Sequence, residues 1–131
     1  MKTAIIVVRT LLGLVYFVFG LNGFLQFMPM PPMPEGAGAF LGGLMSASYF
    51  FPVLKLTETL GGLVLLTGRF TPIALIVLAP VTVQIFLFHL FLTPMSQVAM
   101  PLIMVLLHAF LGWAYFPAFA GLFKANSKVR A

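Results

Sequence analysis

Residues 52–69 read PVLKLTETLGGLVLLTGR, a segment that is apolar enough to cross a bilayer and yet carries Lys55 and Glu58. Its apolar side chains favour membrane insertion by roughly 5 kcal/mol in total, whereas each charge costs about 3 kcal/mol near a helix centre. The segment is therefore about neutral for insertion alone and needs neighbouring helices. Because residues three apart share a helix face, the spacing predicts that Lys55 and Glu58 pair and point into a bundle. The pair is either a structural ion pair that fixes helix register or part of a functional site.

The composition indicates a small integral membrane protein with a single domain over residues 1–131. The chain is 62% hydrophobic and only 7% charged, which lies far outside the range of soluble globular proteins. Its net charge of +5 comes from basic residues at the ends of apolar segments, with no basic stripe that would bind nucleic acid. The sequence contains no cysteine, which excludes disulfides, thiolate catalysis and thiolate metal sites.

The pattern of apolar runs predicts an all-α fold, a bundle of four transmembrane helices. Each run is close to the roughly 20 residues that a span needs. A signal peptide is the competing interpretation of the first run, but its apolar part is too long and no small-x-small cleavage site follows. Thr71 is the expected N-cap of the third helix, with Pro72 at the first helical position. The expected spans are residues 4–28, 52–67, 72–92 and 98–119.

The connection between the first two spans begins with PMPPMP, residues 29–34, which cannot lie inside a helix because proline lacks the amide donor. Residues 35–48 then place apolar side chains at helical spacing among many glycines. This predicts a short interfacial or re-entrant helix that covers the outer end of the bundle. The pairs Gly42–Gly43 and Gly61–Gly62 are expected to permit close helix packing.

The distribution of basic residues predicts the orientation. Lys and Arg occur before or within the first span, at residue 69 and in the C-terminal tail, whereas the 29–49 loop and the 93–97 turn contain none. The positive-inside rule therefore places both termini in the cytoplasm, with the protein in the cell (inner) membrane.

The polar side chains of the spans are expected to gather in one half of the bilayer. At about 1.5 Å per residue from helix midpoints near Tyr16, Leu60, Thr82 and His108, all of them lie at the centre or in the outer half. We therefore expect an outward-facing polar pocket between the helices. Its candidate ligand-binding residues are Asn22, Gln26, Lys55, Glu58, Gln84, His89 and His108.

Several ligands are compatible with these residues. Hydrogen-bond donors such as His89, His108 and Lys55, beside many phenylalanines, suit an apolar molecule with carbonyl oxygens, such as a quinone. His89, His108 and Glu58 are also a two-histidine, one-carboxylate set, but no metal-binding spacing supports it, and no metal site is assigned. Each histidine can equally be a hydrogen-bonded core residue, and Glu58 can be a proton carrier.

Four strings resemble the DoxX family of small four-span membrane proteins: RTLLGLVYFVFGLNGFLQF (9–27), PMPPMP (29–34), LKLTETLGGLVLLTGRFTP (54–72) and WAYFPAF (113–119). The most specific parts are the NGF segment at 22–24 and the K-x-x-E-x-x-GG segment at 55–62. The resemblance implies a four-helix bundle similar in outline to vitamin K epoxide reductase. It also implies an association with membrane redox processes, including quinone-linked sulfur oxidation and partnership with oxidoreductases. The absence of cysteine departs from any thiol-relay version of that fold.

Three hypotheses about function follow. In the first, the outer-half pocket binds a small apolar or quinone-like molecule in support of a redox enzyme partner, without intrinsic activity or as a quinone-linked oxidoreductase component. In the second, the protein is a small-molecule or proton-coupled carrier in which Glu58 titrates. The third is a non-catalytic assembly subunit of a membrane complex. The thin bundle is also compatible with a homo-oligomer.

Overall fold

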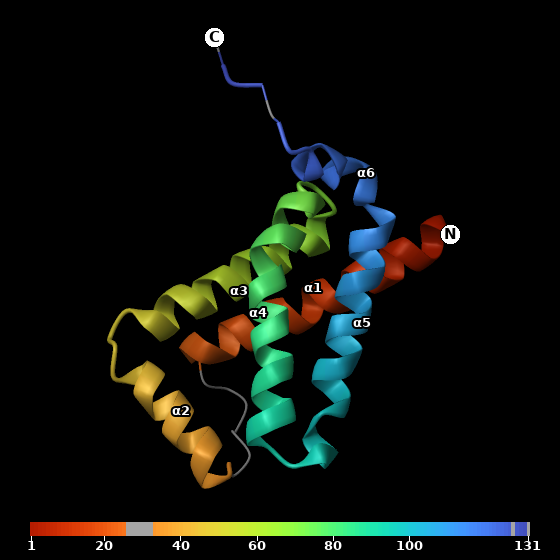
Figure 1. Ribbon diagram of the computed structural model, residues 1–131. Coiled ribbons are helices and arrows are strands. Elements are labelled where there is room, and N and C mark those ends of the chain that lie inside the picture. The colour runs from red at the N-terminus through yellow and green to blue at the C-terminus, as the bar shows by residue number, and fades with distance from the viewer. Residues whose placement is uncertain (26–32, 127, 131) are drawn as a thin grey trace.

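The computed structural model describes residues 1–25, 33–126 and 128–130 and is helical throughout its regular elements (Figure 1). Among these residues no strand is present. The elements are α1 (Lys2–Leu25), α2 (Glu35–Met45), α3 (Phe50–Thr67), α4 (Thr71–Leu92), η1 (Met95–Gln97), α5 (Ala99–Ala114), α6 (Phe116–Phe119) and η2 (Ala120–Phe123).

Three helices, α1, α3 and α4, are long and apolar enough to cross a membrane. The predicted all-helical class is therefore confirmed, and the bounds of α3 and α4 lie within two residues of the expected spans. The first expected span, 4–28, matches α1 up to Leu25, and its last three residues lie outside the described part of the chain. So do the first four residues of PMPPMP.

The predicted fourth span, residues 98–119, is not a single straight helix in the structure. The helix ends at Ala114, and the following segment, Phe116–Phe123, is bent away from α5 by 74°. Pro117 accounts for the break: it has no amide donor, and its ring would clash with the carbonyl of Trp113 in a continuous helix. A fourth span exists only if α5 and the bent segment count as one crossing.

The turn before α4 also differs from the expectation. Phe70, not Thr71, is the N-cap; its φ of 56° and the φ of 76° at Gly68 turn the chain so tightly that Thr71 is already helical. Glycine adopts such a φ without the steric cost that a side chain brings. Among the described residues, the Thr71 hydroxyl is one of two buried polar groups that have no hydrogen-bond partner.

Glycines bring α1 and α3 into close contact along their length. A Cβ added at Gly62 would meet the backbone of Phe17 and Gly13, and one added at Gly20 would meet Thr59. Gly61 instead faces Leu78 of α4. The glycine pair of α3 therefore packs against two different helices, as expected, because small residues let helix backbones approach.

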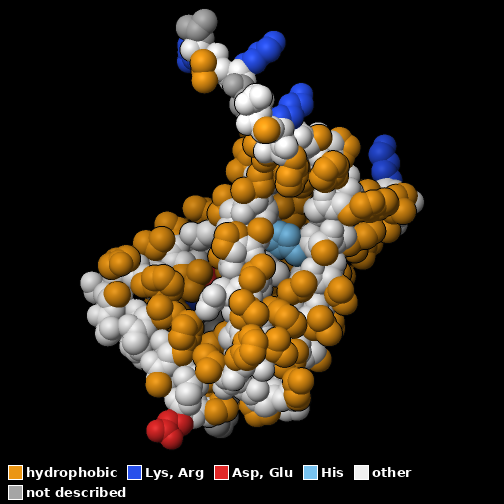
Figure 2. Space-filling view, viewed as in Figure 1, with side chains coloured by type: hydrophobic (Ala, Val, Ile, Leu, Met, Phe, Trp, Pro, Cys, Tyr) orange, Lys and Arg blue, Asp and Glu red, His pale blue; other side chains and the backbone are white. Residues whose placement is uncertain are grey.

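The core lies where α1, α3, α4 and α5 meet, and it is small. Leu12, Tyr16, Leu65, Leu78 and Leu111 are fully buried, whereas many large apolar side chains remain exposed. Hydrophobic side chains cover most of the visible face, and Lys and Arg gather at the end that carries α6 and both termini (Figure 2). Such a surface fits lipid as its solvent.

Helix α2 lies near the opposite end, against α3 and α4 (Figure 1). The Phe40 and Phe88 rings are 5.7 Å apart, and Ala37 is buried. No described atom lies within 4 Å of a Cβ added at Gly42 or Gly43, so the expectation that this pair permits close packing is wrong. Whether α2 lies in the membrane interface stays a prediction.

Candidate functional site

Lys55 and Glu58 form the ion pair that their spacing predicts. The Lys55 Nζ lies 3.5 Å from Glu58 Oε2, and the Glu58 side chain is only 4% exposed while that of Lys55 is 25% exposed. Helix α3 therefore turns its one carboxylate into the bundle and leaves the ammonium group near the edge. A carboxylate at this depth needs a partner, since an unpaired charge in a low-dielectric interior is costly.

The ion pair rests against the end of α1. The aliphatic stem of Lys55 fills the space beside Gly23, where a Cβ would collide with it, and Thr59 donates a hydrogen bond to the Lys55 carbonyl at 2.7 Å. Asn22, the neighbour of Gly23, is half-buried and has an interaction partner of its own. The segment around Asn22 and the segment around Lys55, which are distant in sequence, are thus in contact.

A second polar cluster, which sequence reasoning missed in part, crosses the core of the bundle. Tyr16 of α1, Thr82 of α4 and His108 of α5 are buried and joined by hydrogen bonds. The Thr82 Oγ1 lies 2.8 Å from His108 Nδ1, and His108 Nε2 lies 2.9 Å from the Leu75 carbonyl. The cluster ties three helices together at one level.

The hydrogen bonds that join Tyr16, Thr82, His108 and the Leu75 carbonyl all run in one direction. The Leu75 carbonyl can only accept, so His108 Nε2 donates to it. In a neutral imidazole, Nδ1 is then the acceptor, and the Thr82 hydroxyl donates a hydrogen bond to it. Thr82 in turn accepts from the Tyr16 hydroxyl. Every member is satisfied, which is the condition for a buried polar network to be stable.

The ion pair and the hydrogen-bonded chain are neighbours. Gly62, one turn after Glu58 on α3, packs against the backbone of Phe17, the residue that follows Tyr16 on α1, and both Glu58 and Tyr16 are buried. Five side chains from four helices therefore make one polar centre: Tyr16, Lys55, Glu58, Thr82 and His108.

Two further predicted site residues, Gln84 and His89, do not belong to this polar centre. Gln84 is exposed, because two residues from the inward-facing Thr82 is about 200° around the helix. His89 shares the face of Thr82 but lies about 10 Å along the axis, and its Nδ1 bonds to the Ile85 carbonyl of its own helix at 2.8 Å. Gln26 lies outside the described residues.

The histidines and Glu58 are not assembled as metal ligands. Within the described part of the chain, no three His, Asp or Glu side chains are grouped so that they could hold an ion. His108 already uses both ring nitrogens in hydrogen bonds. The structure thus does not bring the two-histidine, one-carboxylate set together.

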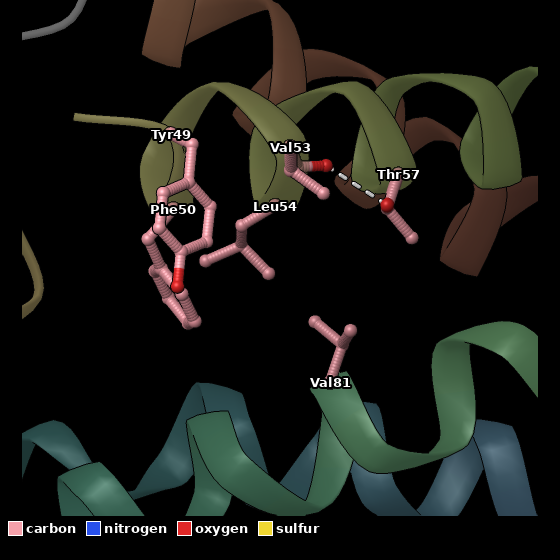
Figure 3. A pocket seen from close by; sticks show the side chains of 6 residues that line it. All are labelled: Tyr49, Phe50, Val53, Leu54, Thr57 and Val81. Carbon is pink, nitrogen blue, oxygen red and sulfur yellow. Dashed lines mark hydrogen bonds between the residues drawn. The ribbon is translucent and has the colours of Figure 1, made fainter. Parts of the chain in front are cut away.

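An apolar groove of about 390 Å³ lies between α3 and α4 (Figure 3). It is lined by Tyr49, Phe50, Val53, Leu54, Thr57 and Val81. The Thr57 hydroxyl donates to the Val53 carbonyl at 2.9 Å, so it offers little to a ligand. None of the six predicted residues that the structure describes lines the groove, but Leu54, Thr57 and Val81 directly adjoin Lys55, Glu58 and Thr82 in sequence.

Comparison with known proteins adds no relative: no family model, no curated protein and no solved structure matches this chain.

Proposed function

We propose that the protein is a four-span membrane protein of the DoxX type, in the cell (inner) membrane with both termini in the cytoplasm. Three long apolar helices support three crossings, and α5 counted together with the bent segment Phe116–Phe123 supports a fourth. An even number of crossings puts both ends of the chain on one side, and the basic residues cluster at that end.

In this proposal, the groove between α3 and α4 binds a small apolar, quinone-like molecule in support of a membrane redox partner. The observation that carries it is the groove itself: its volume falls in the range of small-molecule sites, and its walls are aromatic and aliphatic. Tyr49 and Phe50 present rings on which a flat, apolar molecule can pack, and the Tyr49 hydroxyl can donate to a carbonyl oxygen.

The polar centre lies on the inner side of the same two helices. Glu58 and Thr82 are each the next residue after a groove residue, Thr57 and Val81, and both are buried. A ligand bound in the groove would thus lie on one side of α3, with the buried Glu58 carboxylate on another side of the same helix. This arrangement lets the charge state of Glu58 influence what the groove holds, without direct contact.

The test is to purify the protein in mild detergent and to identify bound small molecules by native mass spectrometry with organic extraction. We expect a stoichiometric apolar ligand that Val81→Trp, which fills the groove, removes. Val83→Trp is the matched control, because Val83 is 53% exposed on another face of α4. The double variant Lys55→Met/Glu58→Gln should lower retention while the protein stays folded.

Two outcomes would overturn this proposal. Undiminished ligand in Val81→Trp would exclude the groove, and undiminished ligand in the double variant would exclude a role for the ion pair. A protein that is empty of ligand but carries a second polypeptide would instead be an assembly subunit.

A second candidate, a proton-coupled carrier, is favoured by one observation. The hydrogen bonds from the Tyr16 hydroxyl through Thr82 and His108 to the Leu75 carbonyl run in one direction through the core, and Glu58 is a buried carboxylate on the neighbouring helix α3. Proton flux into proteoliposomes that is lost in Glu58→Gln would support this candidate, and equal flux in the two proteins would exclude it.

A further inference from the structure

A second cleft, of about 300 Å³, opens at the N-terminal end of α1, whereas Gly23 and the ion pair lie at its C-terminal end. It lies between the first turns of α1 and the end of α5, and it is lined by Lys2, Ile5, Ile6, Arg9, Ala114 and Tyr115. Tyr115 is the residue at which α5 stops, so the 74° bend opens this space. Two basic residues, Lys2 and Arg9, and two aliphatic ones, Ile5 and Ile6, therefore border a single cleft whose surface is mostly apolar.

Arg9 is built into the wall of this cleft. Its guanidinium lies against Gly68, at the C-terminal end of α3, where a Cβ would come within 2.9 Å of it. The last carbonyls of a helix carry negative partial charge and hold the cation there. Even so, the Arg9 Nε is buried and is, among the described residues, one of the two buried polar groups without a hydrogen-bond partner. Such an unused charged donor requires an acceptor.

The chain supplies no acidic side chain at this end. Its only two acidic residues are Glu35, which begins α2 near the opposite end, and Glu58, which pairs with Lys55. The basic residues at the end with the termini are Lys2, Arg9, Arg69, Lys124, Lys128 and Arg130. Neither acidic side chain of the protein can therefore pair with Lys2 or Arg9.

We propose that this cleft binds the phosphate headgroup of an anionic phospholipid, with the phosphate against Arg9 and Lys2 and an acyl chain along Ile5 and Ile6. A phospholipid combines an anion with an apolar chain in one molecule, as the lining combines cations with aliphatic side chains. A free phosphate ion would use only the cations. The site rests on the membrane placement proposed above but not on the groove ligand, which belongs to the other end of the bundle.

The experiment is a lipid titration of the full chain in detergent, followed by native mass spectrometry. Phosphatidylglycerol is compared with phosphatidylcholine, which has the same chains without the net charge. We expect one phosphatidylglycerol retained per protein, with affinity lowered about fivefold by Arg9→Gln and by Lys2→Gln. Lys124→Gln and Lys128→Gln remove the same charge from exposed positions outside the cleft and should leave that affinity unchanged.

Three results would overturn the proposal. An equal loss in the two tail variants would show that overall charge, not the cleft, holds the lipid. Displacement of phosphatidylglycerol by millimolar inorganic phosphate would make this a free-anion site. If Arg9→Gln does not fold, the variant of the exposed Lys2 provides the test. Unchanged phosphatidylglycerol affinity in Lys2→Gln would exclude the site. Retention of the groove ligand in the same samples separates this proposal from the previous one.

Discussion

Glu58 is the acidic residue that the helices bury, with 3% of the whole residue exposed. The energetic cost of burying its charge depends on Lys55. Removing a charge from water costs several kcal/mol, and the partner's attraction offsets that cost only while the pair is intact. The consequence is an asymmetry: losing one partner should be worse than losing both.

We therefore expect Lys55→Met to lower the free energy of unfolding by about 2 kcal/mol, less than for a fully buried pair because Lys55 is 25% exposed. Lys55→Met/Glu58→Gln should recover most of that loss, since a neutral amide needs no counter-charge. Thermal or denaturant unfolding in detergent measures both. A double variant less stable than the single variant would contradict a charge-pair explanation.

Tyr16 supplies the first donor of the buried chain, and its hydroxyl has no access to water. Tyr16→Phe removes that donor but leaves the Thr82–His108 bond. The expected loss is about 1 kcal/mol of unfolding free energy, the usual net value of one buried hydrogen bond. Tyr49→Phe is the control, because Tyr49 is 69% exposed, and it should unfold like the unaltered protein. Equal effects in both variants would show that the hydrogen bond of Tyr16 to Thr82 does not stabilise the protein.

At the scale of the element, the contact of α1 with α3 depends on the missing side chains of glycines. Gly62→Ala would push a methyl group into the backbone of Phe17, and we expect a loss of about 1–3 kcal/mol by overpacking. In Gly42→Ala the new methyl group meets no described atom, so helix propensity alone acts and stability should stay equal or rise slightly. Comparing the unfolding midpoints of the two variants in one detergent checks this, and an equal loss in both would refute the packing explanation.

The helices could be predicted because apolar runs with charged or proline-rich ends define a span without any knowledge of its neighbours. The break at Pro117 was missed because a long apolar run hides a local steric effect of one residue. For the site, depth along each helix is informative, since Tyr16, Thr82 and His108 are the predicted helix midpoints and do meet at one level. Depth alone does not show which face of a helix points into the bundle, which is why the prediction includes the exposed Gln84 and omits the buried Thr82.

At the scale of the whole molecule, the proposed orientation can be tested with cysteine, because the natural chain has none and gives no background. Ser96, in η1, and Ala125, in the tail, are both exposed. In intact cells, a membrane-impermeant thiol reagent should label Ser96→Cys and should reach Ala125→Cys only after the membrane is opened. Labelling of both positions in intact cells would refute four crossings with cytoplasmic termini.

The early end of α5 has a consequence for the lipid around the protein. Sixteen residues rise only about 24 Å, whereas the hydrocarbon core of a bilayer is about 30 Å thick. A helix shorter than its surroundings draws the two leaflets together, and each ångström of mismatch has a small energetic cost. In the proposed four-span arrangement the segment after α5 is bent by 74° and adds little to this length. We therefore expect a locally thinner bilayer beside α5, and the protein should collect in thinner regions of a mixed membrane.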